Sequence, residues 1–197
     1  MKSFEDTGKV WFTEDESQVQ TLRDVVFPGG RLNKDVVGRS AREIGAMAGI
    51  DVPATARLIL LPAKGAGVDD VLAKEKLCPV VAILPYKTFQ EAVENARANL
   101  IVEGAGHSAA LHSNNESNIR CAGAELPVSR LVVNQACALT AGGSLTNGFA
   151  PTTTLGCGSW GGNSISENLD YKHLMNVSRI GKVITTRKVP TDAEIWA

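Results

Sequence analysis

Residues 80–111, VVAILPYKTFQEAVENARANLIVEGAGHSAAL, decide the fold that this sequence predicts. An apolar run without alternation opens the stretch at Val80–Leu84 and another closes it at Ser108–Leu111, as is typical of strands buried on both faces. Between them, Thr88 followed by Glu91 marks the start of a helix. Its apolar stripe lies at Phe89, Ala92, Val93 and Ala96. Strand, helix and strand in this order predict parallel strands with a covering helix.

The same pattern continues on both sides of this stretch. Further apolar runs lie at residues 58–61 and 131–133, and helices are expected at residues 14–26, 41–48 and about 115–124. Two more capping boxes mark the first two of these helices, Thr13 with Glu16 and Ser40 with Glu43. We therefore predict an α/β fold with a parallel sheet over residues 1–165.

The amino-acid composition changes after Asn134. Residues 140–164 are rich in Gly, Thr, Ser and Asn, and predict a long ordered loop of the kind that usually serves function. A short helix is expected at residues 168–175 and a strand at residues 177–184, before a tail that ends at Trp196 and Ala197. We expect residues 166–197 to form an arm that packs on another subunit.

Composition excludes several classes of protein. The 197 residues carry a formal net charge of −1, so no electrostatic footprint for nucleic acid stands out. No apolar run approaches the length of a membrane span, and no secretory signal follows Met1. The 4 cysteines are far apart and show neither zinc spacing nor a disulfide framework. We expect reduced thiols, no metal and a cytoplasmic location.

The segment from Gly156 to Gly161 satisfies the pattern GxGxxG but does not fit a dinucleotide-binding fingerprint. That fingerprint needs a strand before it, a helix opening on its last glycine and an acidic residue about 20 positions on. Here the motif lies inside the Gly-rich loop. We expect its glycines to supply positive φ angles or close backbone approach.

His107 and Glu75 each precede an expected strand and are candidates for acid–base chemistry. Glycines before His107 place it at a turn on the edge of the sheet. If the two strands are parallel neighbours, both side chains emerge at one edge as an imidazole–carboxylate pair. A structural histidine is the alternative, and ligands usually bind at the opposite edge of such sheets. Arg130 is either a contact for a substrate anion or a surface residue in a salt bridge.

Three segments point to a family: residues 74–80 (KEKLCPV), 103–113 (EGAGHSAALHS) and 147–168 (NGFAPTTTLGCGSWGGNSISEN). They resemble the CoA-acylating aldehyde dehydrogenases, and with the ending at residues 189–196 they are most similar to the succinate-semialdehyde and sulfoacetaldehyde dehydrogenases. The resemblance covers the C-terminal portion of that family. It implies the three-layer catalytic domain of the aldehyde dehydrogenase fold and a homo-oligomer that binds neither nucleic acid nor membrane.

The resemblance also implies a reaction and its residues. A cysteine thiolate attacks an aldehyde, hydride passes to NAD or NADP, and coenzyme A takes up the thioester. Glu75, with Pro79 nearby, would contact the nicotinamide ribose, and His107 would be the base for a thiol. The substrate tunnel would be bordered by residues 142–147 with Ser144 and Asn147, and by Asn134. Arg130, Ser144 and residues 152–154 are candidates to bind a small anionic aldehyde.

The resemblance places the family's nucleophile and its dinucleotide-binding domain upstream of Met1. Of the four cysteines, only Cys157 would merit a test as a replacement. We expect this chain to be inactive alone, as part of an oxidoreductase. The alternative is an assembly module that retains the fold without chemistry, and the choice between NAD and NADP stays open because the discriminating residues would lie in the absent domain.

Overall fold

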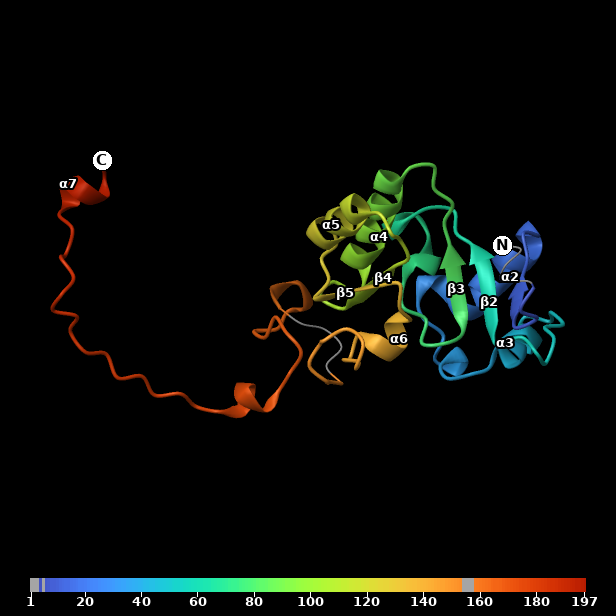
Figure 1. The fold of residues 1–197 in the computed structure, drawn as a ribbon. Coiled ribbons are helices and arrows are strands. Elements are labelled where there is room, and N and C mark those ends of the chain that lie inside the picture. Colours follow the sequence, from blue (N-terminus) through green and yellow to red (C-terminus); the bar gives the residue numbers. More distant parts are fainter. Residues whose placement is uncertain (1–3, 5, 154–157) are drawn as a thin grey trace.

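Five short segments form parallel strands in the computed structural model, which describes residues 4, 6–153 and 158–197 (Figure 1). One sheet has the order β1-β2-β3 and a second sheet pairs β4 with β5. The strands are β1 (Val10–Phe12), β2 (Leu58–Pro62), β3 (Val80–Ile83), β4 (Ser108–Leu111) and β5 (Arg130–Val133). The four strands expected from apolar runs are confirmed, and β1 is an addition.

The central strand of the first sheet is buried on both faces. Ile59, Leu60 and Leu61 of β2 are almost fully buried, and Ile59 pairs in register with Val80 of β3. This is the environment that continuous apolar runs predict for parallel strands. The α/β fold with parallel sheets is therefore confirmed.

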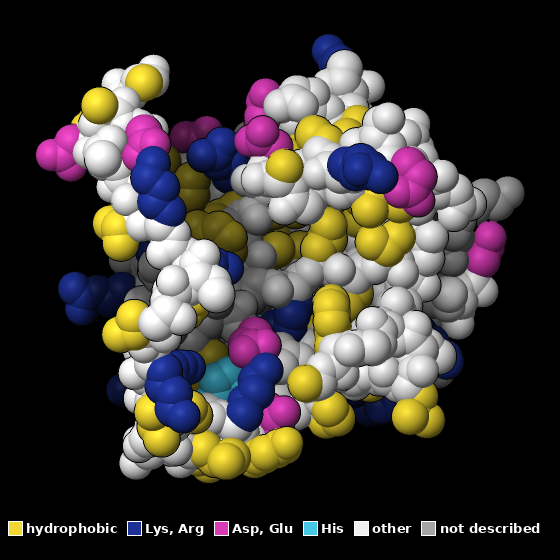
Figure 2. Space-filling model, turned by 60° about the vertical axis from the view of Figure 1, so that its left-hand side comes forward, with side chains coloured by type: hydrophobic (Ala, Val, Ile, Leu, Met, Phe, Trp, Pro, Cys, Tyr) yellow, Lys and Arg dark blue, Asp and Glu magenta, His cyan; other side chains and the backbone are white. Residues whose placement is uncertain are grey.

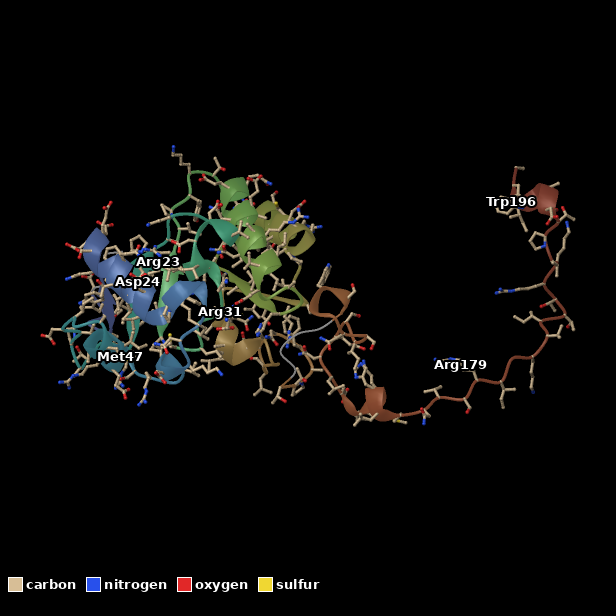
Figure 3. The ribbon with its side chains drawn as sticks, turned by 180° about the vertical axis from the view of Figure 1, so that it is seen from behind. Arg23, Asp24, Arg31, Met47, Arg179 and Trp196 are labelled. Carbon is tan, nitrogen blue, oxygen red and sulfur yellow. The ribbon has the colours of Figure 1, made fainter. Side chains whose placement is uncertain are left out.

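Two separate hydrophobic cores hold the helices to the sheets. The larger core joins β2 and β3 to α2 (Glu16–Val26) and α3 (Ala41–Met47). The smaller one lies between α4 (Phe89–Val102), α5 (Glu116–Glu125) and the pair β4–β5. Helix α2 lies behind the first sheet in Figure 1 and comes to the front in Figure 3. No helix among the described residues has both the length and the apolar character that crossing a membrane requires.

The three expected capping boxes have different outcomes. The box of Ser40 and Glu43 is present at α3. The box of Thr13 and Glu16 is wrong, because Asp15 caps α2 and its carboxylate accepts the Gln18 N–H at 2.9 Å. Asp15, directly before the first turn, takes the role that we expected of Thr13.

At α4 only half of the expected box forms. The Thr88 hydroxyl accepts the Glu91 N–H at 3.2 Å. Glu91 Oε2 in turn accepts the Lys87 N–H at 2.8 Å, one residue before the N-cap. The start of the helix was therefore predicted correctly, and its reciprocal bond was not.

The C-terminal residues 166–197 depart most from expectation, and the exposed part of them, residues 176–197, is called the arm from here on. The helix expected at residues 168–175 is a 3-10 helix, η6 (Tyr171–Leu174), and the strand expected at residues 177–184 is wrong. This segment has no partner strand among the described residues, and Ile180 and Val183 are 90% and 89% exposed. A strand needs a neighbour for its backbone hydrogen bonds, whatever its β-propensity. Figure 3 shows Arg179 and Trp196 of the arm well away from the sheets.

Candidate active site

Glu75 lies in a tight turn between a 3-10 helix, η4 (Val71–Ala73), and β3. Its carboxylate folds back on the turn, where Oε1 accepts the N–H groups of Lys76 at 3.2 Å and Leu77 at 3.3 Å. Leu77 has a φ of 51°, in the left-handed region that a branched residue rarely adopts. Strained backbone of this kind concentrates at functional sites. The turn therefore holds an exposed carboxylate in a defined place at the start of β3.

A cavity of about 400 Å³ opens beside this turn and is called the Glu75 cavity. It lies between the start of β3 and the last turn of α4, which contributes Asn99 and Glu103. Pro79 stands between two residues that line the cavity, Cys78 and Val80, and its carbonyl accepts the Ile59 N–H at 2.9 Å. Pro79 thus joins the turn to the first sheet.

The Lys76 ammonium is the charge of the Glu75 cavity that burial affects most clearly. Burial lowers the pKa of the Lys76 ammonium, while the nearby Cys78, Glu75, Asp70 and Glu103 oppose this shift. The Lys76 Nζ donates to the Lys74 carbonyl at 2.8 Å. Burial raises the pKa of the Cys78 thiol, so it is protonated near neutral pH and is a poor nucleophile.

His107 lines a second cavity, of about 470 Å³, called the His107 cavity. Positive φ angles at Gly104 and Gly106 form the turn before it, and the His107 N–H donates to the Gly104 carbonyl at 2.9 Å. This confirms the turn that the glycines predict. The cavity lies where β4 and β5 begin, against α6 (Cys137–Thr140), and its polar lining residues are His107, Ser108, Arg130, Cys137, Thr152 and Thr153.

Arg130 and Cys137 give the His107 cavity its charge and its thiol. Arg130 pairs in register with Ser108 of β4 and is only 5% exposed, so the surface location is wrong. Burial raises the pKa of the Cys137 thiol, and the positive charge of Arg130 opposes that shift. Parallel pairing of β4 with β5 brings Arg130 beside the residue that follows His107. That proximity could have been deduced from the two apolar runs, whereas the place of Cys137 carried no signal in the sequence.

Glu75 and His107 do not form the expected pair, because β3 and β4 belong to different sheets. Each residue lines its own cavity. The turn at residues 103–107 joins the two places, since Glu103 and Gly104 line the Glu75 cavity and His107 lines the other. Among the described residues, no group of three or more His, Cys, Asp or Glu side chains is arranged to hold a metal ion.

Comparison with known proteins gives a consistent answer, although no family model matches the chain. It is 57% identical over 186 residues, 94% of its length, to the succinate-semialdehyde dehydrogenase (acetylating) of Clostridium kluyveri. It is 36% identical over 165 residues, 84% of its length, to a sulfoacetaldehyde dehydrogenase of an Acholeplasma species. A crystal structure of an acetylating aldehyde dehydrogenase from Geobacillus thermoglucosidasius matches 95% of the chain at 30% identity, with a TM-score of 0.83. The chain belongs to the acylating aldehyde dehydrogenase family.

The chain spans only part of these acylating aldehyde dehydrogenases. It covers 41% of the Clostridium kluyveri relative, 34% of the Acholeplasma relative and 40% of the Geobacillus chain. The matched part is a C-terminal portion of the family's length, as the resemblance implied. The fold and the family are therefore established, whereas the activity of the whole protein is a matter for proposal.

In this acylating aldehyde dehydrogenase chain, the residues expected at the substrate tunnel mostly shape the loop itself. The Asn147 side chain donates to the Thr140 carbonyl at 2.8 Å and accepts the N–H groups of Ser144 and Phe149. A Cβ atom on Gly142 would stand 2.7 Å from the Thr152 carbonyl oxygen, so only glycine allows this approach. Gly142 and Thr152 line the His107 cavity, whereas Ser144 and Asn147 do not.

Asn134 closes the other end of the strand pair. It has a φ of 54°, its Oδ1 accepts the Ser113 N–H at 3.0 Å, and its Nδ2 donates to the Ser113 carbonyl at 3.0 Å. These bonds join the ends of β4 and β5, and Asn134 lines neither cavity. Its observed contacts fit the shaping of a turn.

Part of the GxGxxG segment lies outside the described residues, including Gly156, Cys157 and the adjoining Thr154. Gly158 and Gly162 both have positive φ angles, as expected of glycines that shape a loop. The described part of the motif, residues 158–161, contains only a 3-10 helix, η5 (Ser159–Gly161), and no α-helix begins in the described residues 161–170. The helix that a dinucleotide fingerprint requires is therefore missing from this place.

Proposed function

We propose that this chain is the C-terminal part of an oxidoreductase that converts a small anionic aldehyde, coenzyme A and NAD(P)⁺ to acyl-CoA and NAD(P)H. The observation that carries this proposal is the 57% identity to the acetylating succinate-semialdehyde dehydrogenase of Clostridium kluyveri. The sulfoacetaldehyde dehydrogenase relative also acts, by its name, on a small aldehyde that carries an anionic group. A buried Arg130 beside the hydroxyl groups of Ser108, Thr152 and Thr153 suits the binding of such an anion.

The two cavities suit different parts of this reaction. An exposed carboxylate at the rim of the Glu75 cavity fits the hydroxyl groups of the nicotinamide ribose, because it accepts from two donors at once. The bound nicotinamide would supply a hydride acceptor. His107, in its own cavity, would take the proton from a thiol, either that of the enzyme's nucleophile or that of coenzyme A. The nucleophilic cysteine of the family would come from the rest of the enzyme.

A chimera tests this proposal directly. In it, the present chain replaces the matching segment of the Clostridium kluyveri relative, which contributes everything else. We expect the chimera to reduce NAD⁺ or NADP⁺ when given succinate semialdehyde and coenzyme A, and the isolated chain to show no turnover. The unaltered relative is the positive control, and NAD(P)H absorbance is the measurement. A folded chimera without turnover, or turnover by the isolated chain, would contradict the proposal.

The alternative, an assembly module, is favoured by one observation, the exposed C-terminal arm. Its segment 176–191 contains four basic residues, Lys or Arg, and no acidic ones, interspersed with exposed apolar residues. Figure 2, in which the arm comes forward, shows hydrophobic and basic side chains along it. We propose that the arm covers these side chains by adding a strand to another subunit, so that the chain assembles into a homo-oligomer whether or not it takes part in catalysis. The free thiols of Cys78, Cys121 and Cys137 suit a cytoplasmic location.

Removal of the arm is expected to abolish self-association without unfolding the domain. A variant that ends at Met175 loses the exposed Ile180, Val183 and Val189, none of which belongs to either hydrophobic core. Light scattering coupled to size-exclusion chromatography should show a monomer where the full chain forms an oligomer. The matched control is Ile180→Asp with Val183→Asp, which keeps the length and should give the same monomer. An unchanged oligomer in both variants would assign association to another surface.

A further inference from the structure

Glu103 makes a contact that helix stability does not explain. It follows the last residue of α4 as the C-cap, and its own N–H donates to the Asn99 carbonyl at 3.1 Å. A carboxylate at a helix C-terminus is electrostatically unfavourable there, because the helix dipole places partial negative charge at that end. The Glu103 side chain instead reaches across the Glu75 cavity, where Oε2 accepts the N–H of Glu75 at 2.6 Å. A short hydrogen bond that an ionised carboxylate accepts from a backbone N–H is stronger than one between two neutral groups.

The last turn of α4 holds the preceding chain segment at a second point. Asn99 Oδ1 accepts the Gly67 N–H at 2.6 Å, and Gly67 has a φ of 64°. A Cβ atom on Gly67 would stand 3.2 Å from the Ala98 Cβ, so this segment packs closely on the helix. Asn99 and Glu103, four residues apart on one face, therefore hold the segment that runs into Glu75.

Glu103 also begins the turn that ends at His107. Gly104 and Gly106 fix this turn through their positive φ angles, and the Gly106 N–H donates to the Pro127 carbonyl at 2.7 Å. The chain between Glu103 and His107 is consequently short and held at both ends. The Glu103 carboxylate accepts the N–H of Glu75, so it links the turn at Glu75 to the turn that ends at His107.

We infer that Glu103 is a positioning residue, which sets the place of Glu75 relative to the His107 turn through its bond to the Glu75 N–H. The inference rests on the proposed role of Glu75 in binding the nicotinamide ribose. Without this bond the strained turn around Leu77 keeps a nearby anchor in the Gly38 N–H, which donates to the Leu77 carbonyl at 3.0 Å. Before Glu75, the Lys74 N–H still donates to the Val71 carbonyl at 3.1 Å, so the loss is confined to the bond at the N–H of Glu75 itself. The expected result is a displaced carboxylate on an intact fold.

The first test measures the bond itself in the full chain. Glu103→Ala should speed hydrogen exchange of the Glu75 amide on the order of tenfold, since it removes one charge-assisted bond. Glu103→Gln keeps an acceptor oxygen and should restore most of the protection. Glu125→Ala is the matched control, because Glu125 is the last residue of α5 and pairs with Arg97. Exchange of the Glu75 amide that Glu103→Ala leaves unchanged would overturn the inference.

The second test uses the chimera and separates this inference from the proposed function. Glu103→Ala should raise KM for the nicotinamide nucleotide by roughly five- to tenfold and leave kcat within about twofold. Glu103→Gln should return KM close to that of the parent. Equal KM effects of both substitutions, or a loss of kcat alone, would overturn the inference. If Glu75→Gln leaves KM unchanged, the ribose role of Glu75 fails, while the exchange experiment still decides whether Glu103 holds the turn.

Discussion

Asp70→Ala is expected to lower the free energy of unfolding by about 3–5 kcal/mol, the usual loss when one partner of a buried ion pair is removed. Asp70 and Arg23 form two bonds, Arg23 Nη2 to Oδ2 at 2.8 Å and Nε to Oδ1 at 3.2 Å. Their side chains are 2% and 9% exposed. The Asp70 carboxylate also accepts the N–H groups of Lys64 and Leu72. The substitution therefore leaves two N–H groups of a buried guanidinium and two backbone donors without their acceptor, while Arg23 keeps its bond to Gln20.

The same residue should contribute to acid unfolding. Burial alone would raise the pKa of the Asp70 carboxyl, but the bonds from Arg23, Leu72 and Lys64 outweigh it and hold the pKa below the usual value of an aspartate. A carboxyl with a lowered pKa in the folded state adds stability that is complete above its unfolded pKa. That stability is lost as the pH falls through the folded pKa. The free energy of unfolding of the wild type, measured with urea, should fall below about pH 4. In Asp70→Asn, the part of this fall that is due to protonation of Asp70 should be absent.

Glu125→Ala serves as the control for both measurements. Glu125 pairs with Arg97 at 3.4 Å, but the two side chains are 47% and 54% exposed, so the pair should contribute less than about 1 kcal/mol. Equal losses from Asp70→Ala and Glu125→Ala would show that burial of the Arg23–Asp70 pair carries no special weight. A wild-type acid transition that Asp70→Asn shares in full would assign it to other carboxyl groups.

The sequence predicted the parts of the fold that depend on local pattern. Continuous apolar runs correctly identified β2, β3, β4 and β5. The burial on both faces that such runs predict holds for β2, whereas Val81 of β3 and Ala110 of β4 are exposed. The short edge strand β1 was missed, since three residues at Val10–Phe12 carry too little pattern. Residues 177–184 have the β-branched residues of a strand but no neighbouring strand to pair with among the residues that the structure describes. Whether such a segment forms a strand depends on a neighbouring strand from elsewhere in the chain, and a local sequence pattern carries no information about that neighbour.

The sequence predicted the site only where a residue type indicates the conformation of its own backbone. The glycines before His107 correctly indicated a turn, and the position of Glu75 before β3 was read correctly. That the two residues line separate cavities depends on the division of the strands into two sheets. Cys137 and Glu103 reach the two cavities through contacts with residues far away in the sequence. Their roles therefore became visible only in the three-dimensional structure.

His107→Ala in the chimera should lower kcat by about 10²–10⁴-fold, the range that a positioned general base contributes. The imidazole lines a cavity of about 470 Å³ together with Ser108, Arg130 and Cys137, so it stands among groups that suit a thiol and an anion. Its backbone is fixed by the Gly104 carbonyl and by the Ser129 N–H, which donates to the His107 carbonyl. Removing the side chain should therefore remove chemistry and leave the turn in place.

His112→Ala is the matched control, because His112 follows the same strand by one residue and lines neither cavity. It should keep kcat within about twofold of the parent chimera, since a side chain outside the site removes no transition-state interaction. Added imidazole should restore part of the activity of His107→Ala, because a free base that enters the vacated space replaces a proton acceptor but not a structural contact. Activity of His107→Ala within a few-fold of the parent would exclude the general-base role. A large loss that imidazole does not reverse would point instead to a structural or substrate-binding role for the ring.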